Sequence, residues 1–335
     1  MKVLLVGGTG TISTGVQKVI VEERGYDLYI LNRGNSVARM RPEAHSLIAD
    51  YNDEPAVKAA LQGYHFDTVV DFRIQGVADM EKAVRCFDGI TDQYILISSG
   101  TVYRKPLSKY LVTEDMPLGN YHSAYARNKV ASEMTLRKYI EKGFPGVIVR
   151  PSLTYADFNP LVAMNSRKNP YSIIWRMRKN KPVIVHGDGT NLWTITHNTD
   201  FGRGISGLFG NPETIGEAFH ITSDEVLDWN TIYTDLAHAA GVDANLVHIS
   251  SDTLGDFVPD LRESLEGDHA VSAVFDNTKI KKYVPDFVCK VPWAEGAKRI
   301  VAWFDEDPKA RETVDDEWNA QMDEIIGRYR EIMKP

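Results

Sequence analysis

Three residues of the chain, Ser99, Tyr125 and Lys129, have the types and spacing needed to move a proton beside a reacting oxygen. Tyr125 and Lys129 lie four residues apart in a segment with a helical pattern, which puts them on one face of the helix. A free tyrosine has a pKa of about 10, and a nearby ammonium favours the phenolate and lowers that pKa. Ser99 comes just after the apolar run 94–97, so a strand there would present its hydroxyl at the carboxyl edge of a sheet. Because this Tyr-to-Lys spacing also occurs by chance, its meaning depends on the elements around it.

The first element that could position this chemistry is the N-terminal segment. Residues 2–6 form a short apolar run typical of a buried parallel strand, and the sequence GGTGTIS follows directly. Gly7 and Gly10 allow a tight turn and a close approach of the backbone to a pyrophosphate, which would lie at the N-terminus of the next helix. Ser13 replaces the third glycine of the usual pattern, which mainly serves helix–strand packing. The segment therefore predicts a dinucleotide-binding loop.

Strand-like and helix-like segments alternate through the first half of the chain, as a doubly wound parallel sheet requires. Beyond Arg150 this rhythm changes, and helical patterns no longer alternate strictly with strands. We expect an α/β Rossmann fold with a smaller, mostly helical C-terminal part that binds substrate. The expected units are residues 1–150 and 151–335, with segments near 191–221 returning to the first. The predicted strands are residues 2–6, 28–31, 46–49, 68–71, 94–98 and 147–149.

The composition excludes several classes of protein. The 335 residues carry 38 basic and 46 acidic side chains, a net charge of −8, which argues against nucleic acid or an anionic membrane as partner. Cys86 and Cys289 lack metal-ligand spacing, and the nine histidines are dispersed, so we expect no metal site. No apolar run reaches the roughly 18 residues of a membrane span, and the first strand begins at Lys2. We expect a cytoplasmic protein.

With these motifs, the chain resembles the extended short-chain dehydrogenases/reductases, the family of NAD-dependent epimerases and dehydratases. The similar segments include the glycine-rich loop and residues 50–53, 98–103, 125–129, 150–152, 187–190, 196–200 and 275–279. The resemblance implies that Tyr125 is the general acid/base, that Lys129 holds the nicotinamide ribose and tunes Tyr125, and that Ser99 binds the reacting oxygen. It also implies a set of cofactor-binding residues: Gly7, Thr9, Gly10, Thr11, Ile12, Asn32, Arg33, Asp50, Tyr51, Ser98, Tyr125 and Lys129.

The end of the second predicted strand bears on the choice of cofactor. A carboxylate there usually binds the ribose hydroxyls of NAD, whereas a nearby arginine accommodates the 2′-phosphate of NADP. The strand runs into Asn32 and Arg33 with no acid at its tip, so NADP is favoured and NAD stays possible. A solvated surface role is the alternative for Arg33. Asp50 fits the adenine-recognising acid of the family, and its alternative is a helix N-cap.

The resemblance also bears on the reaction and the substrate. Dehydratases of the family carry an acid pair where this chain has Gly100 and Thr101, which leaves an epimerase or a simple oxidoreductase. Its nucleotide-sugar epimerases hold the diphosphate with an arginine at the position of Trp193, and a tryptophan supplies no charge. Either other basic residues such as Arg167, Lys168 or Arg176 take that role, or the substrate is not a nucleotide sugar. The candidate substrate residues are Arg73, Thr101, Tyr103 and Trp193, of which Trp193 could equally pack in the core.

We therefore predict an NAD(P)-dependent epimerase or oxidoreductase that acts on a sugar or nucleotide-sugar carbinol by hydride transfer. The alternatives are an NADPH-dependent reductase of a small carbonyl compound and a non-catalytic protein that senses a dinucleotide. The expected partner is a small molecule, with no nucleic acid and no membrane. The apolar helical patterns at 79–87 and 125–140 suit the paired-helix homodimer of related enzymes.

Overall fold

The computed structural model describes residues 1–35, 37–160 and 162–334 and contains a central sheet of seven strands. Every neighbouring pair in this sheet is parallel, and the strand order is β12-β7-β5-β4-β1-β2-β3. This doubly wound order confirms the predicted α/β Rossmann architecture. The strands are β1 (Lys2–Val6), β2 (Asp27–Asn32), β3 (His45–Ile48), β4 (Thr68–Asp71), β5 (Tyr94–Ile97), β7 (Gly146–Pro151) and β12 (Ala218–Ile221).

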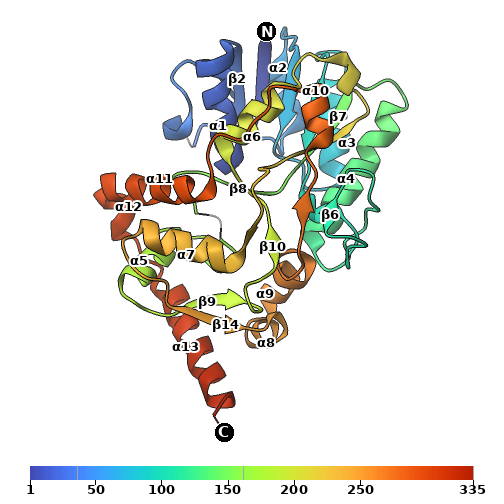
Figure 1. The fold of residues 1–335 in the computed structure, drawn as a ribbon. Helices are drawn as coiled ribbons and strands as arrows, with labels where there is room; N and C mark the ends of the chain where they lie inside the picture. The colour runs from blue at the N-terminus through green and yellow to red at the C-terminus, as the bar shows by residue number, and fades with distance from the viewer. Residues whose placement is uncertain (36, 161, 335) are drawn as a thin grey trace.

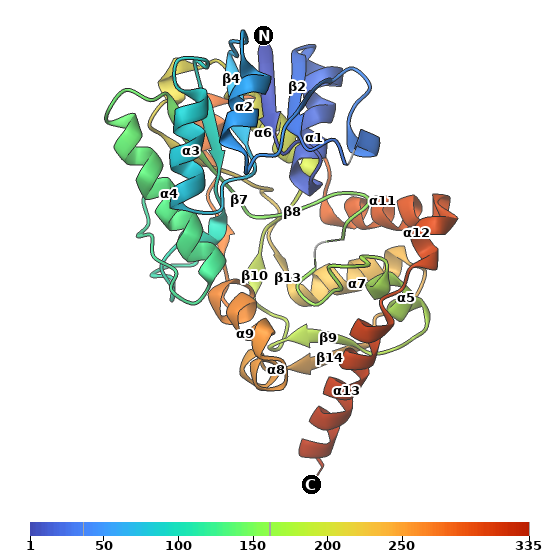
Figure 2. The ribbon, with the colours of Figure 1, turned by 180° about the vertical axis from the view of Figure 1, so that it is seen from behind.

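Helices cover both faces of this sheet, which explains why its strands read as nearly continuous apolar runs. Figure 2 shows α2 (Glu54–Leu61), α3 (Val77–Phe87) and α4 (Ala124–Ile140) on one face. Figure 1 shows α1 (Thr11–Val19) and α6 (Asn198–Ser206) on the other. Alternate residues of β1 enter the two cores accordingly: Leu4 and Val6 face α2 to α4, whereas Val3 and Leu5 face α1 and α6.

The helix α1 packs unusually closely on α6, although the two are almost 190 residues apart in the chain. A side chain added at Gly15 would overlap the backbone of Asn198, and one at Gly202 would come within 2.9 Å of the Gly15 carbonyl. Gly15, two residues after Ser13, therefore allows the close packing that the third glycine of the motif usually serves. Ser13 instead closes the loop, because its hydroxyl accepts from Gly10 N at 2.8 Å and donates to the Gly7 carbonyl at 3.2 Å.

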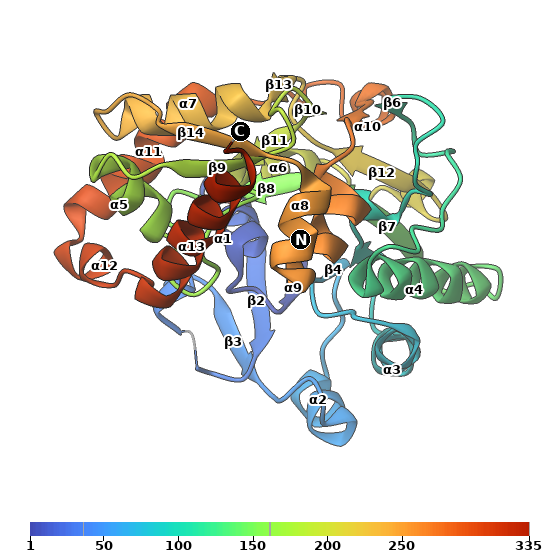
Figure 3. The ribbon, with the colours of Figure 1, turned by 90° about the horizontal axis from the view of Figure 1, so that it is seen from below.

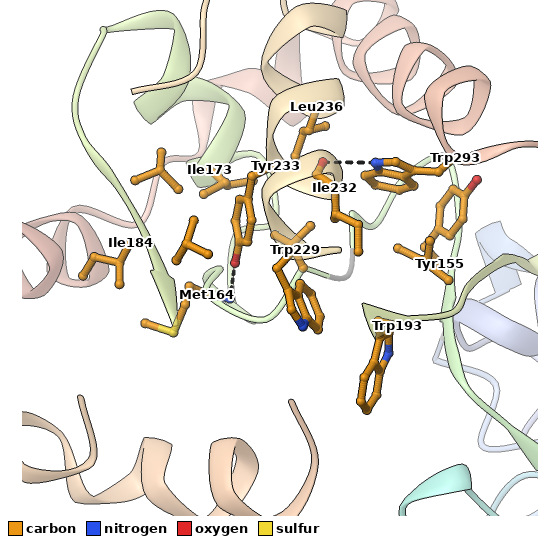
Figure 4. Packing of buried hydrophobic residues seen from close by; sticks show 14 of the residues in the cluster. Tyr155, Met164, Ile173, Ile184, Trp193, Trp229, Ile232, Tyr233, Leu236 and Trp293 are labelled. Atoms are coloured by element: carbon orange, nitrogen blue, oxygen red, sulfur yellow. Dashed lines mark hydrogen bonds between the residues drawn. The ribbon is translucent and has the colours of Figure 1, made fainter. Parts of the chain in front are cut away.

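The elements drawn below the sheet in Figures 1 and 2 enclose a second hydrophobic core. Its centre is aromatic: Trp229, Tyr233 and Trp293 are fully buried, and the indole of Trp293 donates to the Ile232 carbonyl at 3.0 Å (Figure 4). Its helices are α5 (Ser172–Arg178), α7 (Trp229–Ala239), α8 (Ser251–Phe257), α9 (Pro259–Ser264), α11 (Trp293–Glu306), α12 (Pro308–Glu312) and α13 (Asp316–Ile332), with α10 (Thr278–Tyr283) packing near the main sheet. This confirms a helical C-terminal part.

Four two-stranded ladders contribute apolar side chains to the second core. They pair β8 (Leu153–Tyr155) with β11 (Ile195–His197), β9 (Val183–His186) with β14 (Leu246–Ile249), β10 (Leu192–Trp193) with β13 (Leu227–Asp228), and β6 (Leu111–Val112) with β15 (Val274–Phe275). Figure 3, seen from below, shows β8 and β11 next to the main sheet and β9 and β14 farther from it. Within the described ranges, no helix combines the length and the apolarity needed to cross a bilayer.

Candidate active site

Two hollows meet at the carboxyl edge of the main sheet. The first, which we call the sheet-edge cleft, has a volume of about 550 Å³ and runs from the glycine-rich loop after β1 to the start of α4. The second, the adjoining pocket, has a volume of about 530 Å³ and lies between α4, β10 and the segment 260–269. Both hollows share five lining residues: Ser99, Tyr125, Pro151, Ser152 and Leu153. Two of the three predicted catalytic side chains thus stand at the junction.

Separate elements position Ser99 and Tyr125. Ser99 follows β5, and its hydroxyl accepts from Thr101 N at 3.2 Å and from the Thr101 hydroxyl at 3.0 Å. Tyr125 lies in the first turn of α4, which begins after Ser123, whose hydroxyl accepts from Ala126 N at 3.3 Å as an N-cap. The Ser99 hydroxyl interacts with that of Tyr125 and favours its ionised form.

The pKa of Tyr125 is raised above the ordinary value, opposite to the direction that the sequence suggests. Burial of its hydroxyl raises the pKa most, the hydrogen bond from Ser99 lowers it, and the charge of Asp268 raises it further. The Lys129 ammonium lies 5.6 Å from the centre of the tyrosine ring, but it is hydrogen-bonded elsewhere. In the protein alone, Tyr125 is therefore a protonated phenol at neutral pH.

Lys129 is buried and lines the sheet-edge cleft. Its ammonium donates to the Ile74 carbonyl at 2.8 Å, in the loop after β4, and to the Ile97 carbonyl at 2.9 Å, at the end of β5. Burial lowers its pKa to about 8, and the nearby carboxylate of Asp71 partly opposes that shift. These bonds hold the amine in one place at the cleft wall and leave its third proton for a further acceptor.

The glycine-rich loop fits a dinucleotide. Gly7 has a φ of +80° and joins β1 to the N-terminus of α1, where backbone N–H groups favour a phosphate. A side chain at Gly8 would come within 2.8 Å of Ile30, so the loop must pass close to β2. All five predicted loop residues, namely Gly7, Thr9, Gly10, Thr11 and Ile12, line the cleft.

The cleft also includes the residues after β2 and β3. Arg33 is exposed in it, and the Asn32 amide oxygen accepts from Gly34 N at 2.6 Å, which fixes the turn. Asp50 lines the cleft and accepts from Asn52 N at 3.0 Å, while the N-cap of α2 is Asp53 instead. Tyr51 lines the cleft too, but its hydroxyl points to the core and donates to Asp71 at 2.8 Å.

The four candidate substrate residues separate into different places. Thr101 lines the adjoining pocket, whereas Arg73 lines the sheet-edge cleft and lies over the glycine-rich loop, 2.8 Å from where a side chain on Gly7 would begin. Trp193 lines the adjoining pocket with only 2% of its surface exposed. Tyr103 lines neither hollow: it is buried, accepts from Arg150 at 2.8 Å and is hydrogen-bonded to His220.

A buried ion pair behind the site was not predicted from the sequence. Arg150 and Glu133 form a bidentate pair at 2.9 and 2.7 Å, and both side chains are almost fully buried. Ser98 also donates to Glu133, so the pair ties β5 and β7 to α4 directly behind Ser99 and Tyr125. No pattern around residues 133 and 150 marks them as partners before the fold is known.

Asp268 was not predicted from the sequence either. It enters the adjoining pocket from the segment after α9, and this segment is held against α4 because Glu263 accepts from Ala124 N and Asn120 donates to the Gly267 carbonyl at 2.6 Å. Burial raises the pKa of Asp268 to about 6, and the Lys105 ammonium partly opposes this. No group of three or more His, Cys, Asp or Glu side chains arranged to hold a metal occurs among the described residues.

The chain belongs to the NAD dependent epimerase/dehydratase family, whose model matches residues 3–222. It is thus classed with enzymes of the extended short-chain dehydrogenase type. A relative from Bacillus subtilis (strain 168), described as the uncharacterized UDP-glucose epimerase YtcB, is 27% identical over 176 residues. This match spans about half of each chain, 51% of both.

Solved structures share the fold over nearly the whole chain at low sequence identity. UDP-glucuronic acid 4-epimerase from Bacillus cereus in complex with NAD is 18% identical, with a TM-score of 0.73 over 91% of this chain and 99% of the other. DesIV, a dTDP-glucose 4,6-dehydratase from Streptomyces venezuelae with NAD and TYD bound, is 20% identical, with a TM-score of 0.75 over 92% and 98%. The fold is therefore that of dinucleotide-binding epimerases and dehydratases.

Proposed function

We propose that the protein is an NAD(P)-dependent epimerase or oxidoreductase that acts at a carbinol carbon of a sugar. The observation that carries the proposal is the junction of the two hollows at Ser99 and Tyr125. A dinucleotide in the sheet-edge cleft and a substrate in the adjoining pocket would meet only there. The family and its relative described as a UDP-glucose epimerase support a sugar as the class of substrate.

Each side chain has a distinct role in the proposed mechanism. The nicotinamide, when bound, supplies an acceptor or donor of hydride. As a phenol, Tyr125 gives its proton to the substrate oxygen when a carbonyl is reduced; as a phenolate, which the positive charge of an oxidised nicotinamide would favour, it takes the proton of the substrate hydroxyl. Ser99 holds the same oxygen, because its own hydroxyl is fixed by Thr101 and stands beside Tyr125. Lys129 offers its free proton to the cofactor side of the cleft.

Replacing Tyr125 tests this mechanism. Tyr125→Phe removes the proton-carrying oxygen and should lower turnover by roughly 100-fold or more while cofactor affinity changes little. Lys129→Met should lower both turnover and cofactor affinity, because Lys129 lies in the wall of the cleft itself. Tyr121→Phe is the matched control, since Tyr121 is 74% exposed and lines neither hollow. Steady-state rates and calorimetric dissociation constants separate the effects, and near-normal turnover of Tyr125→Phe excludes the mechanism.

We further propose NADP as the preferred cofactor, on the basis of the exposed Arg33 at the end of β2 and the lack of a carboxylate there. A guanidinium can make charge-assisted hydrogen bonds to a 2′-phosphate. Arg33→Ala should weaken NADPH binding roughly tenfold or more and leave NADH binding unchanged. A clear preference of the unmodified protein for NAD(H) overturns this part. Net consumption of NADPH would favour the oxidoreductase, and a redox-neutral reaction the epimerase.

A homodimer is part of the proposal. The helices α3 and α4 lie side by side on one face of the sheet (Figure 3), and Val77 and Met134 on them are exposed. A two-fold pairing of these helices would cover both side chains. The molar mass from light scattering decides between one copy and two.

A further inference from the structure

The adjoining pocket has an acidic lining, which bears on what it can hold. Three carboxylates line it, namely Asp260, Glu263 and Asp268. Among the described residues that line the pocket, the one lysine or arginine is Arg167. A nucleoside diphosphate brings at least two negative charges, which would meet the like charges of this lining, two of them on the exposed residues Asp260 and Glu263. Arg167 and the buried Lys105, whose ammonium acts on Asp268, oppose these three carboxylates with two positive charges, so the charge around the pocket stays negative and disfavours a diphosphate.

Arg176, one of the basic residues that the sequence offered for a diphosphate, is bound elsewhere. It is fully buried, donates to the Pro182 carbonyl at 2.7 Å and forms an ion pair with Asp323 at 2.5 Å. Lys168 lines a different hollow on the far side of Arg167, and the adjoining pocket does not include it. The positive charges of Arg176 and Lys168 therefore do not line the adjoining pocket.

One wall of the pocket is aromatic. Trp193 packs against Trp229 with ring centres 5.9 Å apart and against His269 at 5.5 Å (Figure 4 shows the two tryptophans together). Since Trp229 is fully buried, this cluster forms a rigid wall of the pocket. The wall offers a ring of the ligand an apolar face against which to pack.

The polar atoms on this wall lack partners. The indole N–H of Trp193 is buried and has no hydrogen-bond partner among the described residues, and the same holds for Nδ1 of His269. The Asp268 carboxylate lies 4.0 Å from that nitrogen, beyond hydrogen-bond distance. Nε1 of the fully buried Trp229 in the same cluster likewise has no partner in the described part of the chain, but Trp193 and His269 differ from it in lining the pocket, where a ligand would satisfy them. A hydroxyl group both donates and accepts, so it can complement a carboxylate and an indole N–H together.

We infer, on the basis of the function proposed above, that the substrate is an uncharged polyhydroxylated ring, a free sugar or cyclic polyol without a nucleoside diphosphate. Its hydroxyls donate to Asp268 and accept from the indole N–H of Trp193, while its reacting carbinol lies at Ser99 and Tyr125. The lining charges select for this class by excluding the diphosphate.

The test compares two panels on the protein loaded with cofactor. The neutral panel contains D-glucose, D-galactose and myo-inositol, and the nucleotide panel contains UDP, UDP-glucose and dTDP-glucose. Calorimetry measures binding, and absorbance of the reduced nicotinamide measures hydride transfer. We expect the best neutral ring to bind at least tenfold more tightly than any nucleotide. Tighter binding of a nucleotide, or no binding of any neutral ring, overturns the inference.

Two variants and a control identify the contacts. Asp268→Asn and Trp193→Phe should each weaken binding of the neutral ring roughly tenfold, because each removes a hydrogen bond that only the ligand makes. Asp256→Asn removes one negative charge outside the lining residues and should leave binding unchanged. Equal binding by all three variants contradicts the assigned contacts.

The two proposals fail in different ways. Hydride transfer to or from a UDP-sugar would keep the proposed function and overturn the inference about the pocket. Binding of a neutral ring, with loss in Asp268→Asn but without hydride transfer, would support the inference and count against the proposed function.

Discussion

Asp268 is held near Tyr125 at a cost in stability that depends on pH. Burial raises its pKa to about 6, well above the value of about 3.9 for a free aspartate. The folded state therefore binds a proton more tightly than the unfolded chain does. The contribution of Asp268 to the free energy of unfolding is therefore greatest when its carboxyl is protonated. This contribution falls as the pH rises from about 4 to about 6 and stays low above pH 6.

Asp268→Asn removes this dependence. At pH 8 the variant should be more stable than the parent protein by roughly 2 to 3 kcal/mol, because the buried charge is gone, and at pH 4 the two should be nearly equal. Urea unfolding followed by circular dichroism at pH 4, 6 and 8 measures the difference. A gain of the same size at every pH would show that charge is not its cause.

Residue types could be predicted from the sequence at this scale, whereas their surroundings could not. Ser99, Tyr125 and Lys129 were found by spacing, and the structure brings all three to the sheet-edge cleft. The sequence predicted a lowered pKa for Tyr125, but in the protein alone the pKa is raised, because the hydroxyl is desolvated and the Lys129 ammonium is bound to the Ile74 and Ile97 carbonyls. Asp268 was missed because it reaches the pocket only through the packing of residues 260–269 on α4.

At the scale of elements, the contact between α1 and α6 depends on backbone approaching backbone. Gly15→Ala should push α6 away from α1, because the added carbon would overlap the Asn198 backbone. We expect a loss of roughly 2 kcal/mol or more, the usual range for forced overpacking in a core. Gly327→Ala is the matched control: Gly327 lies in α13 with open space around it, so the change should stabilise the protein by roughly 0.5 to 1 kcal/mol. Denaturant midpoints measure both, and equal effects would mean that close packing is not the cause.

The elements themselves follow from short-range signals. The predicted strands 2–6, 28–31, 68–71, 94–98 and 147–149 are all in the central sheet, because apolar runs between turn residues suffice to mark buried parallel strands. Asp53, and not Asp50, caps α2, a shift of three residues that local composition does not decide. The sequence gives little signal for the two-residue strands β6, β10, β13 and β15, because these strands are defined only by their pairing in the folded protein.

At the scale of the whole molecule, the chain crosses between its two cores more than once. β12 is the last strand of the main sheet beside β7, and α6 covers the face opposite α2 to α4, yet both follow the segment 153–186 that belongs to the second core. Phe201, Ile205 and Phe219 are fully buried against the first strands. The first half of the sequence, which resembles a complete nucleotide-binding unit in its pattern, thus lacks one side of its own core.

Two truncations test this dependence. A chain cut after Pro151 leaves β7 as an open edge and exposes Val3, Leu5 and Val147, so it should aggregate or stay without fixed packing. A chain cut after Asp315 loses only α13, which contacts the second core and extends away from the sheet (Figure 2), so it should keep cofactor binding. Near-UV circular dichroism and cofactor calorimetry on both fragments provide the comparison. The opposite result would be a shorter fragment that unfolds cooperatively and binds cofactor with native affinity. That result would mean that α6 and β12 are dispensable for the sheet. The return of the chain to the first core would then serve only the adjoining pocket.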